Sequence, residues 1–81
     1  MDEQRMTELA RAALVESKRT DCEVTGARAE AAGAWRVELL DVMLKREPFA
    51  VRVEADNAST EEEIKEALRR AVAEHYSVES Y

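Results

Sequence analysis

The sequence predicts an α+β domain with the order helix, three-stranded antiparallel meander, helix, in which both helices pack on one face of the sheet. Apolar residues recur at helical spacing in two segments, one near each end of the chain. Between these segments, residues 35–39 and 49–55 alternate apolar and charged side chains, which is typical of strands with one buried face. Because the connections are short, the strands are expected to pair antiparallel, and two amphipathic helices can then cover the apolar face.

The first expected element is an amphipathic helix over residues 2–18. Its apolar stripe follows the i, i+3, i+4 spacing and consists of Met6, Leu9, Ala10, Ala13 and Leu14. A weaker strand is expected over residues 22–31. Gly26 lies inside this strand, and the apolar positions change parity between Val24 and Ala27, so we expect a β-bulge there.

The two alternating stretches predict a hairpin whose register can be argued from residue types. Facing residues of an antiparallel pair lie on the same side of the sheet, and opposite charges that face each other stabilise by roughly 0.2–1 kcal/mol. The expected partners are Leu39 with Val51, Val37 with Val53, Trp35 with Ala55, Arg36 with Glu54 and Glu38 with Arg52. A shift by two residues would place Arg36 opposite Arg52, which is unfavourable. The turn is then centred near Lys45.

The second helix is the most regular element of the sequence. Residues 56–59 have the composition of a turn, and Ser59 with Glu62, or Thr60 with Glu63, matches the capping box of a helix N-terminus. The apolar stripe that follows consists of Ile64, Ala67, Leu68, Ala71 and Val72. The last six residues of the chain carry too little pattern to be assigned.

Length and composition indicate one small domain, residues 1–81, with a thin core, since a chain of this size buries only about 60% of its unfolded surface. The single cysteine, Cys22, excludes an internal disulfide and is typical of a reducing compartment. No apolar run approaches the roughly 20 residues of a membrane helix, and the N-terminus lacks the apolar core of a secretory signal. We therefore expect a cytoplasmic protein. The net charge of −6 favours solubility and disfavours phosphate-rich partners.

Groups for catalysis or metal binding are scarce. One histidine and one cysteine cannot complete a zinc site by themselves. Cys22 is expected to be a small buried apolar residue, and His75 is expected at the core edge near the end of the second helix. The run Glu61–Glu63 is explained by capping, because successive helix residues point apart. The two glycines form no phosphate-binding motif. Because none of these groups forms a catalytic or ligand-binding motif, we expect no enzyme activity, cofactor, metal site or small-molecule substrate.

The end of the hairpin departs from ordinary turn composition. Turns favour Gly, Asn and Asp, whereas this one contains Val42, Met43, Leu44, Lys45 and Arg46. These residues predict an interface that inserts into a partner groove or a second subunit. The alternative is a bulge near Leu39 and Leu40, which would flip the side-chain parity and return Leu40, Val42 and Leu44 to the core. In either case an open sheet edge remains, and open edges pair with other chains.

The sequence therefore favours a non-catalytic protein-interaction domain, with a homodimer among its expected forms, that uses a sheet edge or the apolar hairpin tip. An acidic inhibitor that occupies the basic groove of a nucleic-acid-handling protein is the alternative. RNA binding is a third reading, because the element order resembles that of double-stranded RNA-binding domains. Those domains carry lysines at the start of the second helix, where this chain reads Thr60-Glu61-Glu62-Glu63. Since these acids would repel phosphates, neither nucleic acid nor a membrane is an expected partner.

Overall fold

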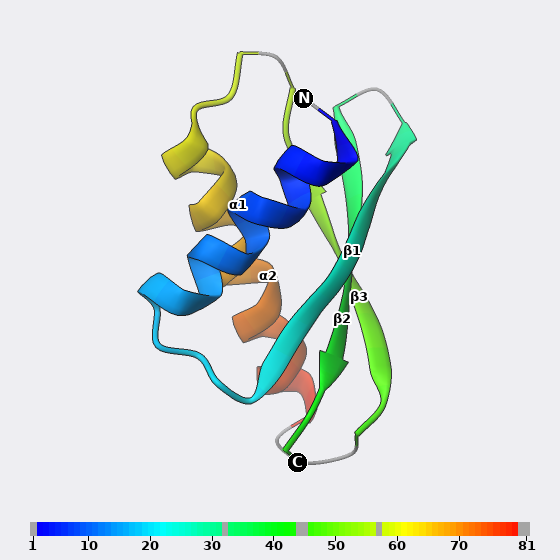
Figure 1. The fold of residues 1–81 in the computed structure, drawn as a ribbon, viewed down its shortest axis with the longest axis vertical. Helices are drawn as coiled ribbons and strands as arrows, with labels where there is room; N and C mark the ends of the chain where they lie inside the picture. Colours follow the sequence, from blue (N-terminus) through cyan, green and yellow to red (C-terminus); the bar gives the residue numbers. More distant parts are fainter. Residues whose placement is uncertain (1, 32, 44–45, 57, 80–81) are drawn as a thin grey trace.

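The computed structural model describes residues 2–31, 33–43, 46–56 and 58–79, and it confirms the predicted α+β order (Figure 1). The elements are α1 (Glu3–Glu16), β1 (Cys22–Ala31), β2 (Ala34–Asp41), β3 (Pro48–Glu54) and α2 (Glu61–Glu79). The three strands form one antiparallel sheet in the order β1-β2-β3. The central strand is therefore β2, and β1 and β3 are the two edges of the sheet.

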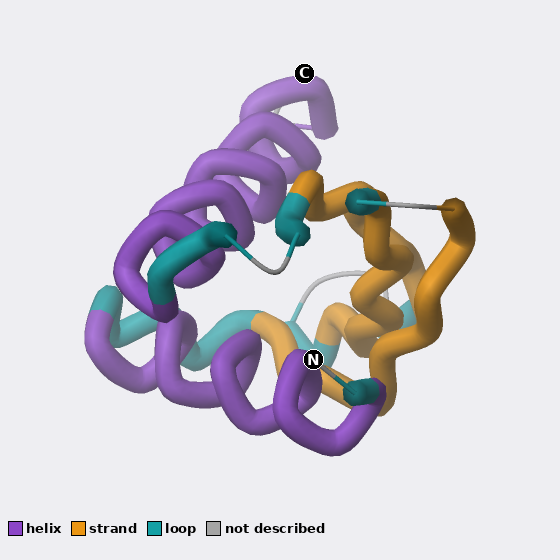
Figure 2. Tube along the Cα trace, turned by 90° about the horizontal axis from the view of Figure 1, so that it is seen from above, coloured by secondary structure: helices purple, strands orange, loops and turns teal. Residues whose placement is uncertain are grey.

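Both helices lie on the same face of the sheet, as predicted. In Figure 1 they stand to the left of the strands, and Figure 2 shows the same arrangement from above. The helix α1 packs mainly against β1, α2 packs against β3, and the two helices contact each other. Within the described part of the chain, no helix covers the opposite face of the sheet, so that face is open to solvent or to a partner.

The core forms where the apolar stripes of the two helices meet the apolar face of the sheet. Its largest fully buried side chains are Met6, Leu39, Ile64, Leu68, Val37, Val53 and Val72. The alternation that predicted the strands also predicted their buried side correctly, since Trp35, Val37, Leu39, Val51 and Val53 are buried and Phe49 packs against them. Hydrophobic periodicity therefore determines which face of each element points inward.

The expected register of the β2–β3 hairpin is wrong by two residues. The observed partners along β2 are Trp35 with Val53, Arg36 with Arg52, Val37 with Val51, Glu38 with Ala50 and Leu39 with Phe49. The same register continues past the strands, because the amide of Asp41 donates a hydrogen bond of 3.0 Å to the carbonyl of Glu47. Two arginines thus face each other where we expected two ion pairs.

Apolar packing explains the observed register. It places Phe49 opposite Leu39, whereas the expected register would have placed the ring opposite Asp41. Burial of a large apolar side chain stabilises by roughly 1.5–3 kcal/mol. Both Arg36 and Arg52 are exposed, so water screens their repulsion, and a facing pair of charges contributes only about 0.2–1 kcal/mol. Exposed charge pairs are therefore weaker determinants of register than the apolar face.

Arg52→Glu tests the register by the sign of its effect. In the observed register residue 52 faces Arg36, so the substitution creates an opposite-charge pair and is expected to stabilise by roughly 0.2–1 kcal/mol. In the register shifted by two, residue 52 would face Glu38 and the same substitution would destabilise. The free energy of unfolding, measured in urea at low salt, decides between them. Arg52→Gln is the matched control, because it removes the repulsion without adding an attraction.

The first strand contains the bulge that its sequence predicts. The pairing of β1 with β2 shifts between Val24 and Gly26, which leaves Thr25 as the extra residue. Cys22 and Val24 before the shift and Ala27 after it are all buried, so the change of parity keeps both halves of β1 facing the core. The bulge also separates a short first part of β1, residues 22–24, from the remainder of the edge.

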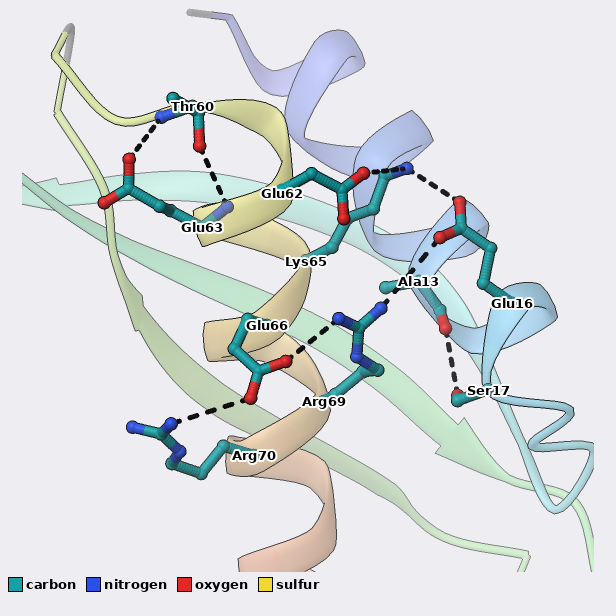
Figure 3. Close-up of polar contacts among 10 residues, drawn as sticks. All are labelled: Ala13, Glu16, Ser17, Thr60, Glu62, Glu63, Lys65, Glu66, Arg69 and Arg70. Atoms are coloured by element: carbon teal, nitrogen blue, oxygen red, sulfur yellow. Dashed lines mark hydrogen bonds and ion pairs between the residues drawn. The ribbon is translucent and has the colours of Figure 1, made fainter.

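The start of α2 shows the second of the two predicted capping boxes (Figure 3). The amide of Glu63 donates to Thr60 Oγ1, and the amide of Thr60 donates to Glu63 Oε1, both at 3.1 Å. One turn further along, the Lys65 ammonium lies 2.7 Å from Glu16 Oε2 of α1. The cap satisfies amides at the start of α2, and the ion pair joins this end of α2 to the end of α1.

Thr60→Ala is expected to destabilise the protein by about 1 kcal/mol, because it removes the oxygen that accepts from the Glu63 amide. Thermal or urea unfolding measures the effect. Thr60→Ser keeps the hydroxyl and should lose little. An alanine variant as stable as the parent protein would show that the capping box contributes nothing.

Candidate interaction surfaces

The hairpin tip predicted as an interface is anchored at its base. Asp41 is only 5% exposed, and its Oδ1 accepts a hydrogen bond of 3.0 Å from the amide of Met43. The amide of Val42 donates to the carbonyl of Asp21 at 3.1 Å, which ties the tip to the residue just before β1. These bonds satisfy backbone groups that a tight turn would otherwise satisfy internally.

The tip residues differ in their exposure. Val42 is partly buried, Met43 is 66% exposed, and Arg46 is exposed with a positive φ of 54°. Leu44 and Lys45 lie outside the described residues. The alternative of a parity-flipping bulge near Leu39 and Leu40 is wrong, because the β2–β3 pairing is regular across both residues, Leu39 is fully buried and Leu40 only partly. Met43 is therefore the apolar side chain that the described part of the tip presents to solvent.

Three rings of the described residues cluster where β3 begins and α2 ends. The rings of Phe49 and His75 stack with centroids 3.9 Å apart, and Tyr76 meets the Phe49 ring edge to face at 5.8 Å. The Arg19 guanidinium lies 5.0 Å above the Tyr76 ring and pairs with Asp21 at 3.0 Å. His75 and Tyr76 contribute to this cluster from α2, which continues to Glu79 through residues that the sequence pattern does not assign. The cluster places His75 at the core edge, as predicted.

Cys22 is buried beneath the same cluster. Burial and the negative charge of Asp21 raise the pKa of its thiol to about 11, so it stays protonated near neutral pH. Burial likewise raises the pKa of Tyr76 above its ordinary value. A protonated buried thiol is a poor nucleophile and behaves as a small apolar residue.

A groove between α1 and the outer edge of β1 was missed by the sequence analysis. It has a volume of about 370 Å³ and is lined by Arg11, Leu14, Val15, Arg19, Cys22, Glu23 and Val24. We call it the edge groove. Val15 lies outside the buried stripe of α1 and is 76% exposed, which makes it, with Met43, one of the two large apolar side chains most exposed among the described residues. The signal was present in the sequence as an apolar residue that does not fit the helical stripe.

The edge groove exposes backbone as well as side chains. The Arg11 guanidinium donates a hydrogen bond of 3.5 Å to the carbonyl of Val24, so this carbonyl points outward over the edge of β1 rather than toward β2. In an antiparallel strand the amide and carbonyl of one residue point to the same side. The first part of β1 therefore presents hydrogen-bonding groups to any strand that enters the groove.

The edge groove and the hairpin tip lie at the same end of the molecule. A second hollow, lined by residues 17–21, adjoins the edge groove and shares Arg19 with it. Asp21, in this hollow, accepts the hydrogen bond from Val42 at the base of the tip. Figure 1 shows the α1–β1 connection, the end of β2 and the start of β3 at the lower end of the fold. The base of the tip and the edge groove are therefore connected through the hollow between them.

The open face of the sheet carries a row of arginines across its three strands. Arg28 faces Arg36, and Arg36 faces Arg52. Acidic side chains on the same face compensate the positive charge of these arginines. The Arg28 guanidinium, for example, lies 3.4 Å from Glu38 Oε1. The mixed charge makes this face a poor match for the repeating phosphates of a nucleic acid.

Within the described ranges, no group of three or more His, Cys, Asp or Glu side chains could hold a metal ion. The helices described there are also too short or too polar to cross a membrane. Comparisons with protein-family models, curated proteins and solved structures found no match to this chain.

Proposed function

We propose that this chain is a non-catalytic protein-interaction domain that binds its partner by strand addition at the edge groove. The observation that carries the proposal is a free edge strand beside a groove of about 370 Å³ into whose rim a 76% exposed valine projects. Backbone groups of the edge supply affinity in this mode of recognition, and the neighbouring groove selects side chains.

The energetics favour occupation of the groove. Covering Val15 fully would contribute roughly 1.5–3 kcal/mol, and each new backbone hydrogen bond about 0.5–1.5 kcal/mol. Arg11 protects the edge of β1 from pairing with another strand only weakly, because its hydrogen bond to the carbonyl of Val24 is 3.5 Å long. An edge strand guarded in this way is open to pairing.

The partner in this proposal is another protein chain, and a second copy of this chain is one form it can take. The hairpin tip supplies an additional contact through Met43, which lies at the same end of the fold. The protonated thiol of Cys22 supports a non-catalytic role. The free cysteine is also consistent with the reducing environment of the cytoplasm, where we place the protein.

Amide NMR of the ¹⁵N-labelled protein tests the proposal with a neutral strand-forming octapeptide. Threonine occupies every second position of this peptide, and valine and glutamine alternate at the others. We expect its addition to shift the amide signals of Cys22, Glu23 and Val24 together with that of Val15. A matched peptide with proline at two central positions cannot form a strand and should leave these signals unchanged.

Self-association is measured in the same samples by raising the protein concentration without peptide. Shifts at the same residues would show that a second copy occupies the edge groove, and they would also support the proposal. If the signals of β1 change neither with millimolar peptide nor with protein concentration, strand addition at this edge is excluded. Val15→Asp should weaken either form of binding, because residue 15 is exposed and the substitution leaves the core intact.

A further inference from the structure

We infer that the edge groove selects an extended segment of another protein in which acidic and apolar side chains alternate on the face that meets α1. The inference rests on the proposed function and adds the chemistry of the partner to it. It is carried by the basic character of the groove in an otherwise acidic chain.

Charge along the edge groove and the hollow beside it is opposite in sign to that of the whole protein. The chain has a net charge of −6. The groove and the hollow beside it are lined by Arg11, Lys18 and Arg19 against Asp21 and Glu23. Arg19 and Asp21 neutralise each other in an ion pair of 3.0 Å. Arg11 has no ion pair with any residue that the structure describes, and Lys18 is exposed, so two cations remain against one acid.

The basic side chains surround an apolar surface at the bottom of the groove. Leu14 and Val24 are buried beneath the groove, and Val15 stands exposed at its rim. On α1, Arg11 and Val15 are one turn apart, so their side chains are neighbours along the helix. Arg19 lies beyond the end of α1, after Lys18 with its positive φ of 57°, and lines the groove from the loop that leads to β1. A strand laid along β1 turns every second side chain toward Arg11 and Val15. A carboxylate beside an apolar side chain would match this pair.

A second copy of the chain is a poorer occupant of the same groove. Antiparallel pairing of two β1 strands near residues 22–24 would bring Arg11 of one copy beside Arg11 of the other. Like charges brought together in this way are destabilising and select against the wrong partner. An acidic segment from a different protein meets the same surface with attraction. The bulge at Thr25 limits the pairing to a short strand, because the regular edge is interrupted there.

Three octapeptides that differ only in charge test the inference. Their common pattern has threonine at every second position, with valine alternating with glutamate, glutamine or lysine at the others. Dissociation constants come from amide NMR titration of the ¹⁵N-labelled full chain at low ionic strength. We expect the glutamate peptide to bind at least about tenfold more tightly than the lysine peptide, with the glutamine peptide between them. The preference should shrink as salt is added.

Arg11→Glu is the decisive variant. It changes an exposed residue on the rim of the groove, and it is expected to weaken binding of the glutamate peptide about tenfold and to remove or reverse the preference over lysine. Arg52→Glu is the matched control, because it changes the net charge equally on the strand at the far edge of the sheet. In this control variant the three peptides should keep the same order of affinity.

The outcomes separate the inference from the proposed function. Equal affinity for the three peptides, with shifts at Cys22–Val24, would keep strand addition and overturn the acidic preference. A dimer of the chain that occupies the edge groove and excludes the glutamate peptide would overturn the inference in favour of a second copy. Failure of all three peptides and of self-association would overturn both. The inference is supported if the glutamate peptide binds tightly, Arg11→Glu weakens this binding and Arg52→Glu leaves it unchanged.

Discussion

Leu39→Ala is expected to destabilise the protein by about 3 kcal/mol. Leu39 is fully buried in the core, on the central strand of the sheet and opposite Phe49. Truncation of a buried leucine costs roughly 2–5 kcal/mol, because it removes apolar contacts and leaves a cavity that the surroundings fill only in part. A domain of this size has a total stability on the order of 5 kcal/mol, so the variant should be close to unfolding. Urea unfolding followed by the fluorescence of the buried Trp35 measures the loss.

Leu40→Ala is the control for this prediction. Leu40 is chemically identical and adjacent, yet it lies on the open face of the sheet and is only partly buried. Its truncation should cost less than about 1 kcal/mol. Similar losses for the two variants would contradict the observed parity of β2 and would revive the bulge that returns Leu40 to the core.

Periodicity explains why the element order and the buried faces could be predicted from the sequence. Each buried position is specified locally, by apolar neighbours three and four residues away in a helix or two residues away in a strand. The stripe from Met6 to Leu14 and the alternation around Leu39 are of this kind, and both are buried as expected. The bulge at Thr25 was predictable for the same reason, because it changes the parity of the apolar residues around it.

The hairpin register depends on a contact that the alternation does not reveal. Both registers considered for the hairpin keep the same residues on the apolar face, so the choice rests on which partners meet across it. Phe49 prefers the position where it faces Leu39 and stacks on His75, a residue that lies far along the chain on α2. The exposed charges, from which the other register was predicted, contribute less than this packing.

The sequence marks Val15 as an apolar residue outside the helical stripe, but it does not reveal the edge groove, because the walls of the groove come from separate elements. Arg11 and Val15 belong to α1, whereas Val24 belongs to β1, and only the packing of the helix against the edge of the sheet brings them together. The hairpin tip, by contrast, is one continuous segment and could be identified by its composition. Its position beside the groove follows from the bond between Val42 and Asp21, which no local pattern predicts.

Phe49→Ala is the second substitution for which we expect a large effect, a loss of about 2 kcal/mol. A fully buried phenylalanine costs about 3–5 kcal/mol on truncation, but this ring is partly exposed, which lowers the expected value. The ring contacts His75 and Tyr76 near the end of α2, and aromatic pairs contribute beyond the area they bury. The substitution should therefore destabilise the last turns of α2 as well as the hairpin.

Amide hydrogen exchange distinguishes this local effect from a uniform loss of stability. We expect exchange in Phe49→Ala to accelerate more at His75 and Tyr76 than at Ile64 and Lys65 near the capped start of α2, because only the end of the helix relies on the ring. Phe49→Leu keeps apolar bulk without the stacked ring, so it should recover stability in part and leave the faster exchange of the helix end. If exchange accelerates equally along α2, the aromatic cluster does not hold the end of the helix, and its extension to Glu79 needs another cause.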